Sequence, residues 1–301
     1  MRVTERLVFE NASRNTGRAR TAAEEARQAL ARGTRVEHPG DDPAKAGLIL
    51  AHRMSADRLT AISGATSAAA DEIGAADSAL DGVSTALSRA RELTVQLSNA
   101  TYSASERQDG AKEVDGLLAQ VVSSLNARVG NRYIFGGTKD DAPPFQTDGS
   151  YTGDHADRKV EIAPGVTQQA NVRADVALKG YDEASQTYDS QKDVLATLQR
   201  LGAALRANDV TGVQGTLDGL QAGITQVANA RAQAGVSMST FDSATSAAQI
   251  ASDRDRVNAG KMSDVDIADA SIQLQATQTA LEASYAATAQ SFRLSILSYL
   301  K

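Results

Sequence analysis

A heptad pattern over residues 48–101 constrains the fold of this chain more than any other feature. Apolar and small residues recur there at alternating spacings of four and three, which is the pattern of a helix packed lengthwise on a partner helix. A single helix of this length would extend for roughly 80 Å. The positions are Leu48, His52, Ser55, Leu59, Ile62, Thr66, Ala69, Ile73, Ala76, Leu80, Val83, Leu87, Ala90, Thr94, Leu97 and Thr101. The pattern therefore predicts a rod-like molecule.

The composition supports close helix packing and narrows the possible functions. Hydrophobic residues make up 42% of the 301 residues, aromatic residues only 4%, and much of the apolar share is alanine. The absence of cysteine excludes disulfides, thiol catalysis and cysteine-ligated zinc. A net charge of -6 without a basic, aromatic stripe predicts no nucleic-acid partner. No apolar run approaches the ~20 residues of a membrane span, so no membrane partner is expected.

Two start and stop signals precede the long helix. Residues 4–32 carry a thin alanine face at helical spacing, and Gly33 is suited to end a helix. Asp42 followed by Pro43 favours a helix start, because the carboxylate can accept hydrogen bonds from unpaired N–H groups and proline lacks an N–H that the first turn leaves unpaired. We predict a helix over 4–32, a turn-rich joint over 33–43, and the start of the long helix near Pro43.

The periodicity changes in the middle of the chain. A third helix is expected from a cap at Ser103 or Ser105 to Gly130, with a stripe at Val114, Leu118, Val121 and Leu125. Residues 133–184 then lose helical spacing, hold five of the twelve aromatic residues, and contain strand candidates over 158–162 and 166–172. This stretch predicts a small β-rich insertion.

Helical spacing returns in the second half. Ser190 and Asp193 form a capping-box pattern, and a break is expected at 208–212. A second heptad pattern follows at Val213, Leu217, Leu220, Ile224, Val227, Arg231, Ala234, Met238, Phe241, Thr245 and Ala248. We predict that the two patterns pack against each other. After a break at 260–263, the last helix becomes apolar around most of its circumference, so other molecules must cover it.

The residues do not assemble an enzyme site. The three histidines fall in separate segments, and the chain lacks the phosphate-loop, dinucleotide and zinc-protease motifs. Asp140, Asp141, Asp148, Asp154 and Asp157 cluster in the insertion, but turn formation explains them better than a calcium loop. We expect no catalytic residues, no cofactor and no metal.

Three stretches resemble the bacterial flagellin family, and in particular its hook-associated proteins of type 3. The segment around Arg35, Asp41, Asp42 and Pro43 is similar to the conserved N-terminal segment of that family. The stretch 132–145, RYIFGGTKDDAPPF, resembles the entry to its middle domain, and 291–300, SFRLSILSYL, resembles its C-terminal helix. The resemblance covers the whole chain in order.

The resemblance implies a mainly α fold in which both halves of the chain form an elongated antiparallel rod. It implies a terminal assembly domain over 1–40 and 264–301, disordered in the free monomer. A rod domain would span 41–132 and 185–263, with an outer β insertion over 133–184. The implied role is a structural one at the junction between the flagellar hook and filament, seating the first flagellin subunits. A minimal flagellin and, less well supported, a cytoplasmic signalling coiled coil stay open as alternatives.

The resemblance also implies partners and location. The subunit would assemble into a ring, contact a neighbouring hook-associated protein and flagellin, and bind an export chaperone. It would be extracellular, and the N-terminal stretch has no apolar run typical of a cleavable signal peptide. The joint would rest on Asp41, Asp42 and Pro43. The assembly interface would be formed by Val3, Leu7, Val8, Leu281, Tyr285, Phe292, Ile296, Leu297 and Leu300.

Overall fold

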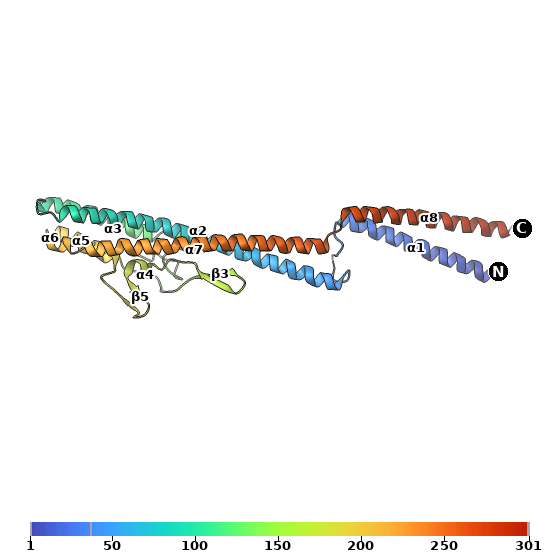
Figure 1. Ribbon diagram of the computed structural model, residues 1–301, viewed down its shortest axis with the longest axis horizontal. Coiled ribbons are helices and arrows are strands. Elements are labelled where there is room, and N and C mark those ends of the chain that lie inside the picture. Colours follow the sequence, from blue (N-terminus) through green and yellow to red (C-terminus); the bar gives the residue numbers. More distant parts are fainter. Residues whose placement is uncertain (1, 37, 300–301) are drawn as a thin grey trace. The chain divides into compact units, whose positions relative to one another are not determined.

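The computed structural model describes the backbone of residues 2–36 and 38–299, with the side chains of Leu7, 10–36 and 38–290. The fold is mainly helical with a small β-rich insertion, as predicted (Figure 1). The helices are α1 (Arg2–Arg32), α2 (Pro43–Leu97), α3 (Ala104–Leu125), α4 (Ala174–Lys179), α5 (Val194–Arg206), α6 (Val210–Gln214), α7 (Leu217–Ser263) and α8 (Ile267–Tyr299). The strands are β1 (Arg128–Val129), β2 (Arg132–Tyr133), β3 (Lys159–Ala163), β4 (Val166–Gln169), β5 (Tyr181–Asp182) and β6 (Thr187–Tyr188).

The chain divides into two compact units. The first comprises Met1–Asp57 and Ala251–Lys301, and the second comprises Arg58–Ile250. Helices α2 and α7 each contribute residues to both units. The finer division into terminal, rod and insertion domains stays a prediction.

In the second unit, the two heptad patterns face each other as predicted. Every position of the first pattern from Ile62 to Leu97 is buried. The hydroxyl groups of Thr66 on α2 and Thr245 on α7 lie 2.7 Å apart. One apolar cluster joins the two helices and contains Ala69, Ile73, Ala170, Ala234 and Phe241. The long helix is therefore held by packing along its length.

At the start of the first heptad pattern, the buried positions lie one residue later in the chain than predicted. Leu48 is 53% exposed and Ser55 is also exposed, whereas Ile49 and Ala56 are buried. The shift follows from contacts with α7, because Ser252 Oγ donates a hydrogen bond of 3.0 Å to the carbonyl of Ala56. The contact with the partner helix, and not the hydrophobicity of Leu48, selects the buried face here.

Helices α3 and α5 complete the main core of the second unit. The fully buried leucines of this core are Leu80, Leu87, Leu125, Leu178, Leu195, Leu198, Leu201, Leu205 and Leu220. Arg107, which is 3% exposed, fastens one end of this core. Its guanidinium donates hydrogen bonds to the carbonyls of Leu97 and Asn99, at 3.0 and 2.8 Å, and to Asn208 Oδ1 at 2.6 Å. The bond to Leu97 satisfies a carbonyl at the end of α2 that the helix itself leaves unpaired.

Two predicted helix boundaries are corrected. Ser103, one of the two predicted caps, starts α3 in a full capping box with Glu106. The predicted end at Gly130 is wrong, because α3 ends at Leu125. Asn126 ends it, because its side chain turns away to bond the backbone N–H and carbonyl of Phe145 at 3.0 and 2.8 Å. Gly130, with a φ of 60°, instead forms the turn between β1 and β2.

The start of α5 and the insertion were also predicted imperfectly. Asp193, and not Ser190, caps α5 by accepting a hydrogen bond of 3.0 Å from the N–H of Ala196. The predicted break at 208–212 contains the short helix α6, and the insertion contains α4, which the sequence pattern did not indicate. The strand pairs are antiparallel: β1–β2, β3–β4 and β5–β6.

Salt bridges and apolar contacts attach the insertion to α2. Glu72 of α2, only 8% exposed, pairs with Arg132 of β2 and with Arg158 beside β3. Val160 and Ile162 of β3 pack against the apolar cluster between α2 and α7. These contacts fix the position of the β3–β4 hairpin within the second unit.

Candidate assembly surfaces

The predicted joint residues Asp41, Asp42 and Pro43 lie at the start of α2 in the first unit. Asp41 Oδ2 accepts a hydrogen bond of 2.8 Å from the N–H of His38. Asp42 Oδ1 accepts one of 3.1 Å from the N–H of Lys45, and Asp42 Oδ2 lies 3.0 Å from Lys45 Nζ. The N–H and ammonium groups of Lys45 hold the pKa of Asp42 below its usual range. Asp42 and Pro43 therefore start the helix as predicted, while their role as a domain joint stays a prediction.

The two segments that connect the helices of the first unit are hydrogen-bonded to each other. Gly33 ends α1 with a φ of 70°, and its carbonyl accepts a hydrogen bond of 3.0 Å from the N–H of Val265. The carbonyl of Ser263 accepts one of 2.6 Å from the N–H of Arg35. The sequence located the joint after α1, but the break predicted at 260–263 was wrong, because α7 continues to Ser263 and the break lies at 264–266. The pairing of the two segments was missed, because hydrogen bonds between backbones more than 200 residues apart leave no local pattern.

A small apolar cluster and a histidine–aspartate pair hold α2 to α7 beside these segments. Val36, Ile49 and Ala259 form the cluster. His52 Nδ1 lies 2.8 Å from Asp255 Oδ1, and both side chains are partly buried. The hydrogen bond from Ser55, together with that from His52, lowers the pKa of Asp255. His52 therefore has a specific partner, which the spacing of acids along its own helix did not reveal.

Helices α1 and α8 lie side by side in the first unit (Figure 1). The contact is made by small side chains: Ala23 is buried, and the hydroxyls of Thr16 and Thr288 lie 3.2 Å apart. Of the predicted interface residues, Leu281 is half-buried, while Leu7 and Tyr285 are 49% and 51% exposed. The side chains of Val3, Val8, Phe292, Ile296, Leu297 and Leu300 lie outside the described residues.

The surface of α8 has exposed apolar side chains and few charges. Ile267 and Ile272 are 70% and 67% exposed, in addition to Tyr285. Between residues 270 and 290, Glu282 is the single charged residue. The sequence predicted a last helix that is apolar around most of its circumference, but it did not single out Ile272. Large apolar side chains exposed on a nearly uncharged helix indicate an interaction surface.

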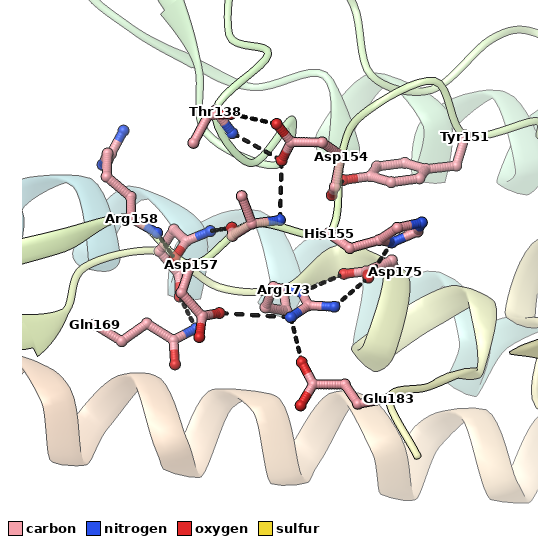
Figure 2. Close-up of polar contacts among 12 residues, drawn as sticks. Thr138, Tyr151, Asp154, His155, Asp157, Arg158, Gln169, Arg173, Asp175 and Glu183 are labelled. Atoms are coloured by element: carbon pink, nitrogen blue, oxygen red, sulfur yellow. Dashed lines mark hydrogen bonds and ion pairs between the residues drawn. The ribbon is translucent and has the colours of Figure 1, made fainter. Parts of the chain in front are cut away.

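A dense polar network organises the insertion around Arg173 (Figure 2). Its guanidinium donates to both oxygens of Asp175, at 2.9 and 2.6 Å, and to Glu183 at 2.5 Å, with Asp157 at 3.5 Å. His155 Nδ1 lies 2.8 Å from Asp175, whose side chain is fully buried. Burial raises the pKa of Asp175, but the bonds from Arg173 and His155 outweigh it and leave the pKa lowered. The network is internally charge-paired and joins three segments of the insertion.

Asp154 and Asp148, two further aspartates of the insertion, stabilise the local backbone. Asp154 accepts hydrogen bonds from the N–H groups of Thr138 and Ala156, and Asp148 accepts one from the N–H of Ser150. Across the described residues, no three histidine or acidic side chains gather in an arrangement that could hold a metal ion. Nor is any helix of the described chain long and apolar enough to cross a bilayer.

Both halves of the chain match models of one protein family. Residues 4–140 match the bacterial flagellin N-terminal helical region. Residues 217–300 match the bacterial flagellin C-terminal helical region. The unmatched residues between them contain β3 to β6 and the helices α4, α5 and α6.

Similarity to single proteins agrees with this match. Flagellar hook-associated protein 3 of Salmonella typhimurium is 26% identical over 307 residues, covering 95% of each chain. The fold is shared with the crystal structure of Bacillus cereus FlgL (24% identity, TM-score 0.56, 72% of this chain and 99% of that one). It is also shared with flagellar hook associated protein-3 of Legionella pneumophila (14% identity, TM-score 0.61, 71% and 98%). The chain therefore belongs to the bacterial flagellin family, within which it is similar along its length to hook-associated protein 3.

Proposed function

We propose that this chain is a structural subunit of the bacterial flagellum that forms the junction between hook and filament and seats the first flagellin subunits. The similarity to flagellar hook-associated protein 3 of Salmonella typhimurium over 95% of both chains carries the proposal. That similarity spans the β-rich insertion as well as the helices. A role as an extracellular component belongs to the same proposal.

The exposed apolar side chains of α8 support an assembly role. A monomer gains nothing by exposing Ile267, Ile272 and Tyr285 on a helix that has few charges. Burying an isoleucine that is two-thirds exposed would stabilise a contact by about 1–2 kcal/mol. Repeated in a ring, such contacts would hold subunits together without any catalytic chemistry. We propose that α1 and α8 supply this interface, with Leu7, Leu281 and Tyr285 among its residues.

The partners follow from this role. The subunit would form a ring with its own copies, contact a neighbouring hook-associated protein on one side and flagellin on the other, and travel to the export apparatus with a chaperone. Neighbouring copies around a ring make head-to-tail contacts, so two different surfaces of each subunit take part.

Complementation distinguishes the junction role from that of a minimal flagellin. We expect the gene to restore filaments and swimming to a bacterium that lacks its own hook-associated protein 3. We expect no rescue of a bacterium that lacks flagellin, and no long filaments from the pure protein. Long filaments from the pure protein would show instead that the chain is a filament subunit.

A double variant tests the assembly interface. Phe292→Ala with Leu297→Ala is expected to keep the helicity of the wild-type monomer, measured by circular dichroism, and to lose complementation. The matched control replaces two exposed residues of the insertion, Lys159→Ala with Thr167→Ala, and should still complement. Normal complementation by the double variant would remove these residues from the interface.

A further inference from the structure

A groove of about 710 Å³ lies in the second unit between the insertion and α7. Residues of α7 from Gln226 to Ser237 form its floor. One wall consists of β4 and the segment that follows it, and the other consists of α4 and β5. The volume is within the range of about 300–1,000 Å³ that ligand sites occupy. The floor is roughly 16 Å long, which matches about five residues of extended chain.

The β4 wall presents an open strand edge to this groove. The N–H of Ala170 donates to the carbonyl of Arg158, so these two residues form a hydrogen-bonded pair of the β3–β4 ladder. Pairs alternate in an antiparallel ladder, and the backbone groups of Thr167 and Gln169 therefore point away from β3. No other strand of the described chain pairs with β4. Gln168 and Gln169 both line the groove. Successive side chains of a strand point to opposite faces of the sheet, so a groove that both residues line must border the edge of β4.

The opposite wall presents a second open edge. The N–H of Asp189 donates to the carbonyl of Gly180, so Gly180 and Asp189 form a hydrogen-bonded pair of the β5–β6 ladder. The next pair, Tyr181 and Tyr188, is therefore a non-hydrogen-bonded pair. The backbone N–H and carbonyl of Tyr181 consequently point away from β6. Within the described residues, β5 has no strand partner other than β6. Tyr181 and Asp182 both line the groove.

The side chains of the groove favour an uncharged or basic ligand. Gln168, Asn229 and Gln233 offer carboxamides that can donate and accept hydrogen bonds. The positive charge of Arg173 is already engaged by Asp175 and two further carboxylates, and its side chain is 9% exposed. Figure 2 shows Asp157, Gln169 and Glu183 on the side of this network that faces the helix below it. The groove is lined by Asp157, Asp182 and Glu183 beside Arg173 and Lys192, so acidic side chains outnumber basic ones.

We propose that this groove binds an extended polypeptide segment of neutral or basic character, which adds as a strand to the open edges of β4 and β5. Gln169 of β4 and Tyr181 of β5 each present a backbone N–H and a carbonyl that their own ladder does not use, and an extended backbone is a ligand that can pair with such groups. The carboxamides of α7 then contact the same backbone from below. Because this chain has a net charge of -6, we assign the segment to another protein and not to a second copy of this chain. The inference is independent of the proposed junction role.

The test uses the full chain and a capped seven-residue peptide of alternating threonine and valine, with a lysine at each end. Titration followed by fluorescence anisotropy of the labelled peptide is expected to give saturable binding in the micromolar range. The same peptide with alternate backbone nitrogens methylated keeps its side chains but cannot donate to a strand edge. Its affinity should be at least tenfold lower. Equal binding of the two peptides, or no binding at millimolar peptide, would overturn the proposal.

Two matched tryptophan variants locate the binding. Gln233→Trp fills the groove from α7 and should weaken peptide binding at least tenfold. Val236→Trp places the same side chain on the same helix, at a residue that is 68% exposed and does not line the groove, and should bind as wild type. Unchanged binding by Gln233→Trp would contradict the assignment. Self-association of the pure chain that Gln233→Trp abolishes would show that a second copy occupies the groove, and would also overturn it.

Discussion

Replacing Arg107 with methionine tests how the second unit is closed at one end. The guanidinium donates to the carbonyls of Leu97 and Asn99 and to Asn208 Oδ1, and Arg107 is 3% exposed. Methionine keeps most of the buried stem but removes the donor from the Leu97 carbonyl and from Asn208 Oδ1, and it leaves the Asn99 carbonyl with only its bond from the N–H of Tyr102. The bond to the Leu97 carbonyl is fully buried, while the other two are partly buried, so water can replace them in part.

The expected cost of Arg107→Met is about 3 kcal/mol. A buried acceptor left unsatisfied costs about 1–3 kcal/mol, and the two partly buried acceptors add a smaller amount. In a unit of roughly 200 residues, each 1 kcal/mol lowers the melting temperature by about 2–4 °C, so we expect a decrease of about 6–12 °C. Thermal and urea unfolding, followed by circular dichroism at 222 nm, would measure both quantities.

A control on a neighbouring helix makes the result interpretable. Arg91 is exposed on α2, and Arg91→Met removes the same charge without a buried partner. Its unfolding free energy should stay within about 0.5 kcal/mol of wild type. If Arg107→Met unfolded as the control does, the three hydrogen bonds would not stabilise the unit and the argument would be wrong.

Two further predictions concern packing and pH. A Cβ at Gly110 would overlap the side chain of Leu97, whereas Gly116 on the same helix has nothing within 4 Å. In urea unfolding, Gly110→Ala should therefore lower the free energy of unfolding by about 1–2 kcal/mol, and Gly116→Ala should raise it by about 0.5–1 kcal/mol. Equal changes in the two variants would contradict the contact between Gly110 and Leu97. The pKa of Asp175 is lower in the folded chain than its ordinary value of 3.8. Its ion pairs therefore stabilise the folded state fully at pH values above 3.8, and this stabilisation is lost as the pH falls through the lowered pKa. Asp175→Asn should thus destabilise the chain at pH 7 and much less at pH 2, and a pH-independent effect would refute the assignment.

Local signals in the sequence were sufficient for most of the helical fold. Gly33 ends α1 and Pro43 starts α2, because caps and proline act through the backbone of their own turn. The heptad positions from Ile62 to Leu97 are buried because each contributes to a continuous contact with a partner helix. The register failed at Leu48 and Ser55, where contacts with α7 select the buried face. Gly130 was misassigned because a left-handed glycine serves a hairpin turn as well as a helix end.

The polar sites could not be predicted in the same way. His52 pairs with Asp255 from the other half of the chain, and Arg173 gathers carboxylates from three segments. Such partners are brought together by tertiary structure and leave no spacing in the sequence. The groove beside β4 and β5 depends on which edges of short ladders remain unpaired, and strand periodicity alone does not show this.

Labelling of Ile272→Cys tests the assembly role most directly, because the chain contains no other cysteine. Residue 272 is 67% exposed in the single chain, so the thiol should react rapidly with a maleimide in the pure protein. In flagella isolated from a complemented strain, neighbouring subunits should slow the reaction at least a hundredfold. Lys159→Cys in the insertion should stay reactive in both states. Equal reactivity of residue 272 in the free and assembled chain would contradict burial of α8 by neighbouring subunits.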